Sequence, residues 1–421
     1  MQKQIDVQDL EVDMYISQVD RPWLETPFKF QGFFVKSEKH IEEVQRICEY
    51  VYIDVIKGKD TDKILSSNRL FTSPPRPKPS RIYINTTELE EEIAVAESLM
   101  KKTRECLDEV FENIRNDNQL DIPKIKKVVS SLVDSIVRNP NAQMCLAQLK
   151  DKDEYTAQHS INVCILTITF GRHLGMAENS LNLLGLGALL HDIGKIKTPL
   201  EILNKEGRLT PEEFEVMKSH PEHGQEILEK TGGVPDSTID IALSHHERLS
   251  GQGYPHGKMV NEISPWSKVV AIVDVYDAIT SDRCYHDGMS PTRALTKMYE
   301  WRIRDFDPEL LEQFIQCIGI YPIGTIVELS SGEVGIVISV NADLRLRPKI
   351  LLVLDKEKNP YFPSRIADLS AYNFSSNDDN YGIKTVLEPM SYNVNVKDHM
   401  KDIQQAQRVN MARSTKEKEG R

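Results

Sequence analysis

A His-Asp pair that closes an apolar stretch of this 421-residue chain is the first feature that suggests chemistry. His191 and Asp192 follow the small and apolar residues 181–190, and Gly194 and Lys195 come directly afterwards. Titratable groups at the end of an apolar helix are costly to bury unless something binds them, and a metal ion is the natural candidate. Neighbouring helical side chains diverge by about 100°, so one metal would strain to use both, whereas a carboxylate can span two cations. The alternative is a capping Asp beside a solvated His.

Further metal-capable side chains occur at helix-like positions in the same region. Asp274 lies inside the apolar run 269–275, where an Asp is expensive to bury unless it is paired or metal-bound. The candidates comprise five histidines and two aspartates: His159, His191, Asp192, His220, His245, His246 and Asp274. Nitrogen and oxygen ligands without thiolate favour iron, manganese or zinc. Two cations bridged by an Asp can clamp a phosphoryl group during in-line displacement, which indicates a phosphohydrolase.

Two cationic residues follow these candidates closely enough to contact a bound phosphate. Lys195 lies four residues beyond His191, and Arg283 lies nine residues beyond Asp274. An Arg at such a site can make a bidentate phosphate contact. The alternative for Lys195 is a solvated lysine at a helix end.

The candidates fall in a segment with mostly helical periodicity, which we place at residues 121–320. The helical pattern is broken at residues 139–140, at 232–233 and at 251–257. A mainly α domain of this size has room for a buried site between its helices.

Two segments precede this domain. Residues 1–58 mix short alternating apolar stretches with turn-prone residues, and they predict a small β-rich N-terminal domain with one helix near 40–50. Four prolines within residues 73–80 predict a stiff linker, which we place at 59–86.

A connecting helix is predicted at residues 87–120. The spacing of Thr87 and Glu90 fits a capping box. An apolar seam follows in steps of four and three residues: Leu89, Ile93, Ala96, Met100, Thr103, Leu107, Val110 and Ile114. Such a seam suits coiled-coil or bundle packing, so it can form a homodimer or pack against the same chain.

Two segments follow the helical domain. Residues 321–372 contain strand-like stretches at 324–329 and 334–338, with Ser331-Gly332 as the turn, and they predict a small β appendage. Residues 373–421 are polar, and we expect this tail to be partly disordered.

Composition limits the function classes. A net charge of −12 argues against a binder of nucleic-acid polymers, because such affinity comes chiefly from Lys and Arg. The six cysteines form no Cys-x-x-Cys pair, which indicates reduced thiols in a cytoplasmic protein. The sequence has no signal-like N-terminus and no apolar run near the roughly 20 residues that span a bilayer, so we expect no membrane association.

Several separated motifs together resemble the HD-GYP domain, a subgroup of the HD-domain metal-dependent phosphohydrolases. The resemblance covers about residues 155–308. The matching motifs, in order, are His191-Asp192 with Gly194-Lys195, His220-Pro221, His245-His246-Glu247, the run from Gly251 to Pro255, and the run from Asp274 to Tyr285. Residues 4–58 are also similar to a small N-terminal domain of unknown function that is often attached to these bacterial enzymes.

The resemblance implies an HD-type helical bundle that holds two or three metals, usually iron or manganese. It implies hydrolysis of cyclic dinucleotides, above all cyclic di-GMP, in bacterial signalling. All seven metal-capable residues named above match ligands, and Asp192 and Lys195 match the catalytic positions. Lys195 and Arg283 match phosphate contacts, and Gly253-Tyr254-Pro255 matches the loop beside the substrate.

The chain departs from the family pattern near the signature loop and before His159. Ser250 replaces the usual Asp, Leu249 an aromatic or polar residue, and His286 an Arg. Family members with a third metal resemble one another in a Glu one helical turn before the His, where this chain has Tyr155. Glu154 is displaced by one residue, or about 100° around a helix. We therefore expect two metals, and a first cleavage to linear pGpG that is favoured over the second cleavage to GMP.

Two other functions are compatible with the same residues. One is a cyclic di-GMP sensor with little catalysis that relays occupancy to signalling partners. The other is a phosphodiesterase for 3′,3′-cyclic GMP-AMP. A complete ligand set favours an enzyme, because a binding module does not need hydrolytic metals.

Overall fold

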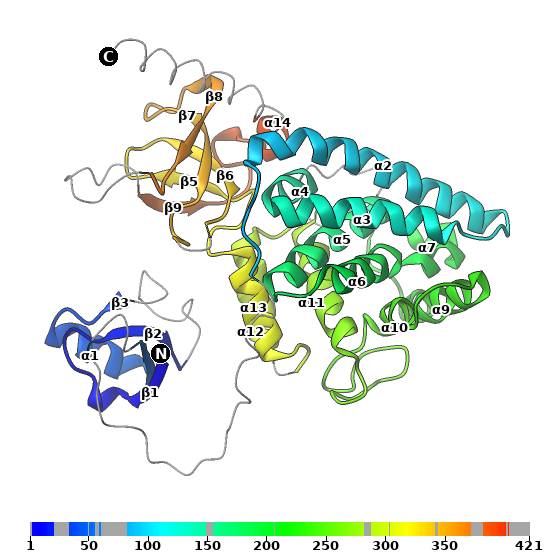
Figure 1. The fold of residues 1–421 in the computed structure, drawn as a ribbon, viewed down its shortest axis with the longest axis horizontal. Coiled ribbons are helices and arrows are strands. Elements are labelled where there is room, and N and C mark those ends of the chain that lie inside the picture. Colours follow the sequence, from blue (N-terminus) through cyan, green and yellow to red (C-terminus); the bar gives the residue numbers. More distant parts are fainter. Residues whose placement is uncertain are drawn as a thin grey trace. The chain divides into compact units, whose positions relative to one another are not determined.

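The computed structural model describes residues 2–20, 33–48, 50–54, 59, 82–148, 155–205, 207–281, 288–302, 304–341, 344–371, 382–400 and 403. The chain forms two compact units, Met1–Pro77 and Lys78–Arg421 (Figure 1). Among the described residues, none of the helices combines the length and apolar composition that crossing a bilayer requires.

The first unit is a four-stranded antiparallel sheet with one helix. Its elements are β1 (Gln2–Asp6), η1 (Val7–Asp9), β2 (Tyr15–Val19), β3 (Phe33–Phe34), α1 (Glu38–Ile47) and β4 (Tyr50–Asp54), and the strand order is β1-β4-β2-β3. Ser37 caps α1 by accepting from the His40 backbone N–H, and Val44 on this helix is buried. Val44 shares a small core with the strand residues Ile5, Ile16 and Val51. The predicted β-rich fold with one helix is confirmed.

The second unit is built around a helical bundle. Its helices are α2 (Leu89–Arg115), α3 (Ile122–Arg138), α4 (Pro140–Ala147), α5 (Tyr155–His173), α6 (Glu178–Leu190), η3 (Ile193–Lys197), α7 (Leu200–Leu203), α8 (Pro211–Lys218), α9 (His220–Thr231), α10 (Asp236–Ser244), α11 (Pro265–Thr280), α12 (Pro291–Trp301) and α13 (Pro308–Ile318). Seven of these helices carry Pro at N1 or N2, where the absent N–H costs no hydrogen bond. The buried surface of α5, α6 and α11 forms the centre of the apolar core.

The long helix α2 packs along α3, α4 and α5 of its own chain (Figure 1). Leu89, Ile93, Leu107 and Val110 of the predicted seam are at most 3% exposed within this core. Of the two readings of the seam, packing within the chain is the one observed. The capping box predicted at Thr87 and Glu90 is wrong: the N-cap residue is Glu88, which makes no side-chain cap bond, and the Thr87 hydroxyl donates to the Glu92 carboxylate.

A five-stranded antiparallel sheet follows the bundle. It comprises β5 (Ile326–Leu329), β6 (Val334–Ser339), β7 (Lys349–Leu354), β8 (Pro360–Asp368) and β9 (Ile383–Leu387), in the order β8-β7-β6-β5-β9, followed by η5 (Ser391–Asn393) and α14 (Val396–Met400). Ile336 and Leu351 join the helical core, while Val337 and Ile350 belong to a second apolar cluster on the opposite face. The sheet extends past the predicted boundary at residue 372, because β9 pairs with β5.

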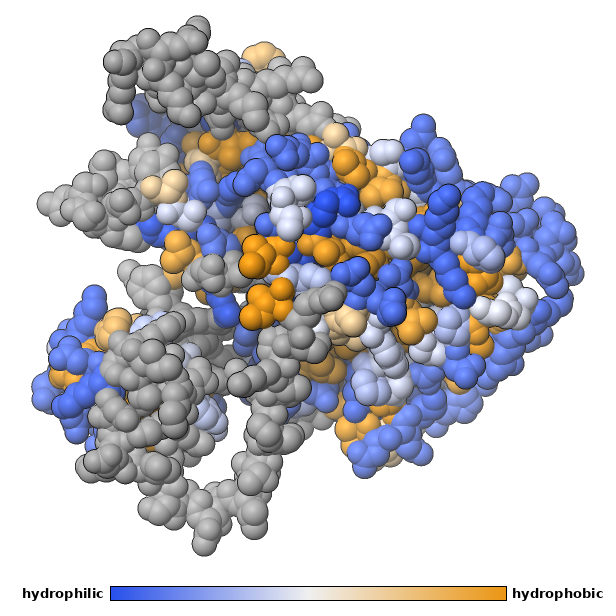
Figure 2. All heavy atoms as spheres, in the orientation of Figure 1, coloured by the Kyte–Doolittle hydropathy of each residue, from blue (hydrophilic) through white to orange (hydrophobic). Residues whose placement is uncertain are grey.

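The surface of the helical unit is mostly hydrophilic on the face seen in Figure 2, with hydrophobic residues in separate groups. Hydrophilic side chains cover the tip of the bundle where α2 ends (Figure 2).

Candidate metal centre

Five helices of the bundle bring the seven predicted residues to one buried place. His159 lies on α5 and Asp274 on α11, while His191 follows the last residue of α6. His220 begins α9, and His245 caps the C-terminus of α10. Six of the seven side chains are nearly inaccessible, and that of His246 is 16% exposed. The fold thus brings these separated residues together in space.

The backbone orients three of the imidazoles in the same way. The Nδ1 atoms of His191, His220 and His245 lie 2.7, 2.7 and 2.9 Å from the carbonyl oxygens of Ala188, Met217 and Ala242. Each carbonyl belongs to the residue three positions earlier, at a helix end where carbonyls lack helical partners. An Nδ1–H that donates to a carbonyl leaves Nε2 unprotonated and directed at the cluster, which is the state that binds metals.

Asp192 stands at the centre of the cluster. Its Oδ1 lies 3.3 Å from Nε2 of His220 and 3.7 Å from Nε2 of His245, while its Oδ2 lies 3.3 Å from Nε2 of His191. Two sets of potential ligand atoms share this carboxylate, one with His220, His245 and His246 and one with His159 and His191. This is the arrangement expected of a carboxylate that bridges two cations.

Asp274 faces the same cluster from α11. Its Oδ1 lies 3.0 Å from Nε2 of His159 and 3.8 Å from Nε2 of His191, and its Oδ2 lies 3.7 Å from Nδ1 of His246. One carboxylate thus contacts residues of both ligand sets. The apolar neighbours of Asp274 on α11 are buried, and the contacts with the imidazoles explain why an aspartate stands among them.

Two buried atoms of the cluster lack a hydrogen-bond partner among the described residues: Nε2 of His191 and Oδ1 of Asp192. A buried polar atom without a partner costs about 1–3 kcal/mol. A divalent cation is a partner that would satisfy an imidazole nitrogen and a carboxylate oxygen together. The donor set therefore fits divalent metals.

The charge states also suit cations. Burial raises the pKa of Asp192, but the Lys195 ammonium and the His191 imidazole outweigh it and hold this pKa well below its usual value. Burial lowers the pKa of His245 to about 4, and burial together with His245 holds the pKa of His246 well below its usual value. Near neutral pH both carboxylates are ionised and these two imidazoles are neutral, as metal ligation requires.

His159 differs from the other imidazoles. Burial lowers its pKa, but hydrogen bonds to Asp274 and Asp277 outweigh burial and raise the pKa to about 9. A cation that binds Nε2 of His159 must therefore displace a proton.

Close packing holds the His191–Lys195 turn against α9. A Cβ atom added at Gly194 would lie 1.9 Å from the carbonyl oxygen of His220 and 2.5 Å from the Gly224 nitrogen. Only glycine permits this approach, which places Asp192 beside His220. Lys195 lies at the rim with a 19% exposed side chain, and its Nζ is 2.5 Å from Oδ2 of Asp192.

The Gly253-Tyr254-Pro255 loop covers one side of the cluster. The Tyr254 ring stacks on His246, with centroids 4.6 Å apart and planes inclined by 29°. Gly253 is required because a Cβ would lie 2.4 Å from backbone atoms of Glu247 and Arg248. Glu247 is 2% exposed and accepts from the backbone N–H groups of His256 and Lys258 at 2.8 and 2.9 Å, which fixes the far end of the loop.

Some predicted positions lie outside the described residues, namely Arg283, His286 and Glu154, and the side chain of Tyr155 is also not described. The departure at Ser250 is described: its backbone N–H donates to the carbonyl of Arg304. Sequence reasoning missed Asp277, which contacts His159 from α11. Its spacing of three residues from Asp274 was the available signal, because such residues share a helix face.

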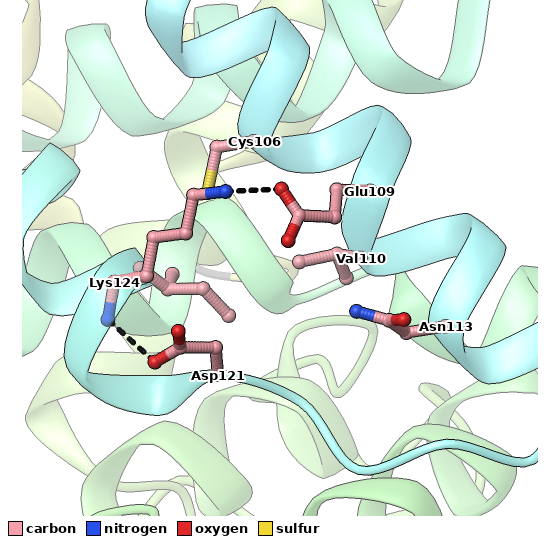
Figure 3. A pocket seen from close by; sticks show the side chains of 7 residues that line it. Cys106, Glu109, Val110, Asn113, Asp121 and Lys124 are labelled. Atoms are coloured by element: carbon pink, nitrogen blue, oxygen red, sulfur yellow. Dashed lines mark hydrogen bonds and ion pairs between the residues drawn. The ribbon is translucent and has the colours of Figure 1, made fainter.

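A shallow pocket outside the cluster lies between the end of α2 and the start of α3 (Figure 3). Lys124 pairs there with Glu109, and its backbone N–H donates to the Asp121 side chain. None of the predicted site residues lines this pocket. Its charges are already paired, so it offers no comparable chemistry.

Three family models match the chain. Residues 143–310 match an HD domain, residues 2–125 match a domain of unknown function named DUF3391, and residues 326–375 match a KOW domain associated with the HD domain. The HD match contains the whole cluster, and the KOW match begins with β5.

Curated relatives share the same region. A cyclic di-GMP phosphodiesterase of Pseudomonas aeruginosa is 35% identical over 375 residues, which cover 88% of this chain and 89% of that protein. A cyclic di-GMP phosphodiesterase of Thermotoga maritima is 37% identical over 39% of this chain and 45% of that protein. A 3′3′-cGAMP-specific phosphodiesterase of Vibrio cholerae is 34% identical over 41% of this chain and 37% of that protein. The chain therefore belongs to the HD-domain metal-dependent phosphodiesterases, in a group that adds a DUF3391 region before the HD domain and a KOW domain after it.

Proposed function

We propose that the protein hydrolyses cyclic di-GMP to linear pGpG, using two divalent cations, iron or manganese, held by the seven-residue cluster. The observation that carries this proposal is the buried carboxylate of Asp192, which lies between two sets of imidazoles and has an oxygen without a hydrogen-bond partner among the described residues. Cyclic di-GMP is preferred because the relative that shares most of the chain's length is named for this substrate.

The proposed ligands divide between the two sets that share Asp192. His220, His245 and His246 would hold one cation, and His159, His191 and Asp274 would hold the other. Cations bound there would neutralise negative charge on the phosphate oxygens of the substrate. Asp192 would contribute to both sites, and the carbonyl-bound Nδ1–H groups keep three imidazoles in the ligating tautomer.

Lys195 and the signature loop act on the substrate in this proposal. The Lys195 ammonium lies at the rim, where it can exchange its contact with Asp192 for a phosphate oxygen. Gly253, Tyr254 and Pro255 form the wall beside the substrate, with Tyr254 held in place by stacking on His246. Arg283 is proposed as the second phosphate contact from its sequence position.

The extent of hydrolysis follows from the number of cations. Two cations suffice to open the ring, whereas the linear product carries a terminal phosphate that a third cation would neutralise. We expect pGpG to accumulate, because Tyr155 stands where third-metal members have Glu.

We expect a small molecule as the substrate, and we expect no binding to nucleic-acid polymers or to membranes. A cytoplasmic location and signalling partners are expected from the sequence. The seam over residues 87–114 does not support a homodimer, because its central residues are buried within the chain.

Incubation of the metal-loaded protein with cyclic di-GMP, 3′,3′-cyclic GMP-AMP and linear pGpG, followed by chromatography over time, tests these assignments. The expected result is rapid conversion of cyclic di-GMP to pGpG with slow formation of GMP. Faster cleavage of cyclic GMP-AMP would replace the substrate assignment. Tight binding without turnover would favour a sensor, and immediate GMP formation would contradict the two-metal reading.

A further inference from the structure

A continuous set of side-chain hydrogen bonds leads from the surface helix α2 to His159 in the cluster. Nη2 of Arg104 lies 2.5 Å from Oε1 of Gln158, and Nε2 of Gln158 lies 2.8 Å from Oδ1 of Asn162. Nδ2 of Asn162 lies 3.3 Å from Oδ1 of Asp277, whose Oδ2 lies 2.7 Å from Nδ1 of His159. Three helices, α2, α5 and α11, contribute to this chain of contacts.

The chemistry of the two ends fixes the direction of every bond. An arginine has only donors and an ionised carboxylate has only acceptors. Gln158 must therefore present its oxygen to Arg104 and its NH₂ group to Asn162, and Asn162 must present its NH₂ group to Asp277. The last step requires His159 to donate from Nδ1, so its Nε2 is the atom left for the cluster.

The direction of these hydrogen bonds matters because most of the side chains involved are buried. Gln158, His159, Asn162 and Asp277 are 6%, 3%, 1% and 1% exposed, so water does not readily replace a broken link. Unlike the three imidazoles that are oriented by backbone carbonyls, His159 is oriented by a side chain. Its geometry consequently depends on residues that touch neither the cations nor the substrate.

We propose that Arg104, Gln158, Asn162 and Asp277 are positioning residues that hold His159 in its ligating orientation and thereby couple α2 to the metal centre. This inference rests on the proposed role of His159 as a ligand. Partners of this kind typically change metal affinity about 10–100-fold when they are altered.

The test measures Mn²⁺ binding to the full-length chain, without nucleotide, by electron paramagnetic resonance. Asp277→Asn should weaken binding about 10–100-fold, because its NH₂ group must face either the NH₂ group of Asn162 or Nδ1–H of His159. Arg104→Met should weaken binding about threefold or more, since it removes the donor that sets the direction. Arg104→Lys, which keeps a donor, should restore much of the affinity.

A matched control is Lys101→Met on the same helix, whose side chain is 80% exposed and pairs only loosely with Glu105 at 3.9 Å. It should bind Mn²⁺ like the unmodified protein. For Asp277→Asn and Arg104→Met, kcat should recover at saturating Mn²⁺, which a general packing defect would not allow.

Unchanged Mn²⁺ affinity in either Asp277→Asn or Arg104→Met would overturn the proposal, because the coupling of α2 to the metal centre requires both residues. If Asp277→Asn fails to fold, Arg104→Met still decides, because its side chain is only partly buried. Failure of the proposed function is distinguishable, since it would show as an unmodified protein that binds no Mn²⁺ or cleaves no cyclic dinucleotide.

Discussion

Two buried carboxylates of the helical unit, Glu92 and Asp192, are each 2% exposed but have opposite surroundings. The oxygens of Glu92 accept from Ser135 at 2.8 Å and from two nitrogens of Arg138 at 2.7 and 2.8 Å, and the Thr87 hydroxyl adds a bond at 3.3 Å. Asp192 has Lys195 on one oxygen and no hydrogen-bond partner among the described residues on the other. Glu92 joins α2 to α3, whereas Asp192 joins imidazoles that converge from separate helices.

The number of hydrogen-bond partners separates a structural polar group from a functional one. A fully partnered carboxylate recovers its cost of desolvation within the protein, so it needs no ligand. A buried carboxylate oxygen that has no hydrogen-bond partner is compensated only when something binds it. The same isosteric change should therefore lower the metal content when it is made at Asp192 and the unfolding free energy when it is made at Glu92.

The largest effect is expected from Asp192→Asn. Loss of the bridging charge should remove at least one cation per chain and lower turnover by about 10³-fold or more, while the far-UV circular dichroism stays unchanged. Elemental analysis and cyclic di-GMP hydrolysis measure the two quantities. Full metal content with full turnover would show that Asp192 is not a ligand.

The matched change Glu92→Gln should reverse this pattern. It weakens the charge-assisted bonds to Arg138, whose side chain is 37% exposed and remains partly solvated, so we expect a loss of about 1–3 kcal/mol in unfolding free energy.

The pKa of Glu92 is lowered because the bonds from Arg138 and Ser135 outweigh burial. The stabilisation by Glu92 is therefore fully present above the pKa that this carboxyl has in the unfolded chain. It is lost as the pH falls through the lower pKa of the folded chain. Urea unfolding at pH 7 and at pH 4 checks both points, and a loss of metal from this variant would break the comparison.

The pH dependence of metal binding separates His159 from the other imidazoles. With a pKa raised to about 9, His159 carries a proton at pH 7 that a cation must displace. Mn²⁺ affinity should thus rise about tenfold per pH unit between pH 7 and 9 and then level off. His245, with a pKa of about 4, adds no slope in this range. Calorimetric titration at several pH values measures the slope, and a flat profile would contradict a protonated His159.

The smallest effect is expected at the pocket between α2 and α3. Lys124→Met removes the ion pair with Glu109, in which both side chains are 47% exposed. Unfolding free energy should change by less than about 1 kcal/mol, and metal content should not change. An altered metal content would mean that this pocket is linked to the cluster.

The sequence was sufficient to find the seven residues that the fold brings together and the helical period, because these depend on residue types and their pattern along the chain. It also predicted β5 and β6, whose alternation and Ser331-Gly332 turn are local signals. It could not predict β9, which is defined by pairing with β5 across more than 50 residues. Nor could it decide whether the α2 seam packs within the chain, or reveal the contacts of Asp277 and Glu247, since each depends on tertiary approach rather than on local pattern.

The cluster around Asp192 is proposed to hold two divalent cations. The most direct measurement is anomalous diffraction at the manganese edge from crystals grown with Mn²⁺. We predict two peaks about 3.5–4 Å apart, both within coordination distance of the Asp192 carboxylate. Active crystals whose only manganese peaks lie away from His191, Asp192 and Asp274 would contradict the account.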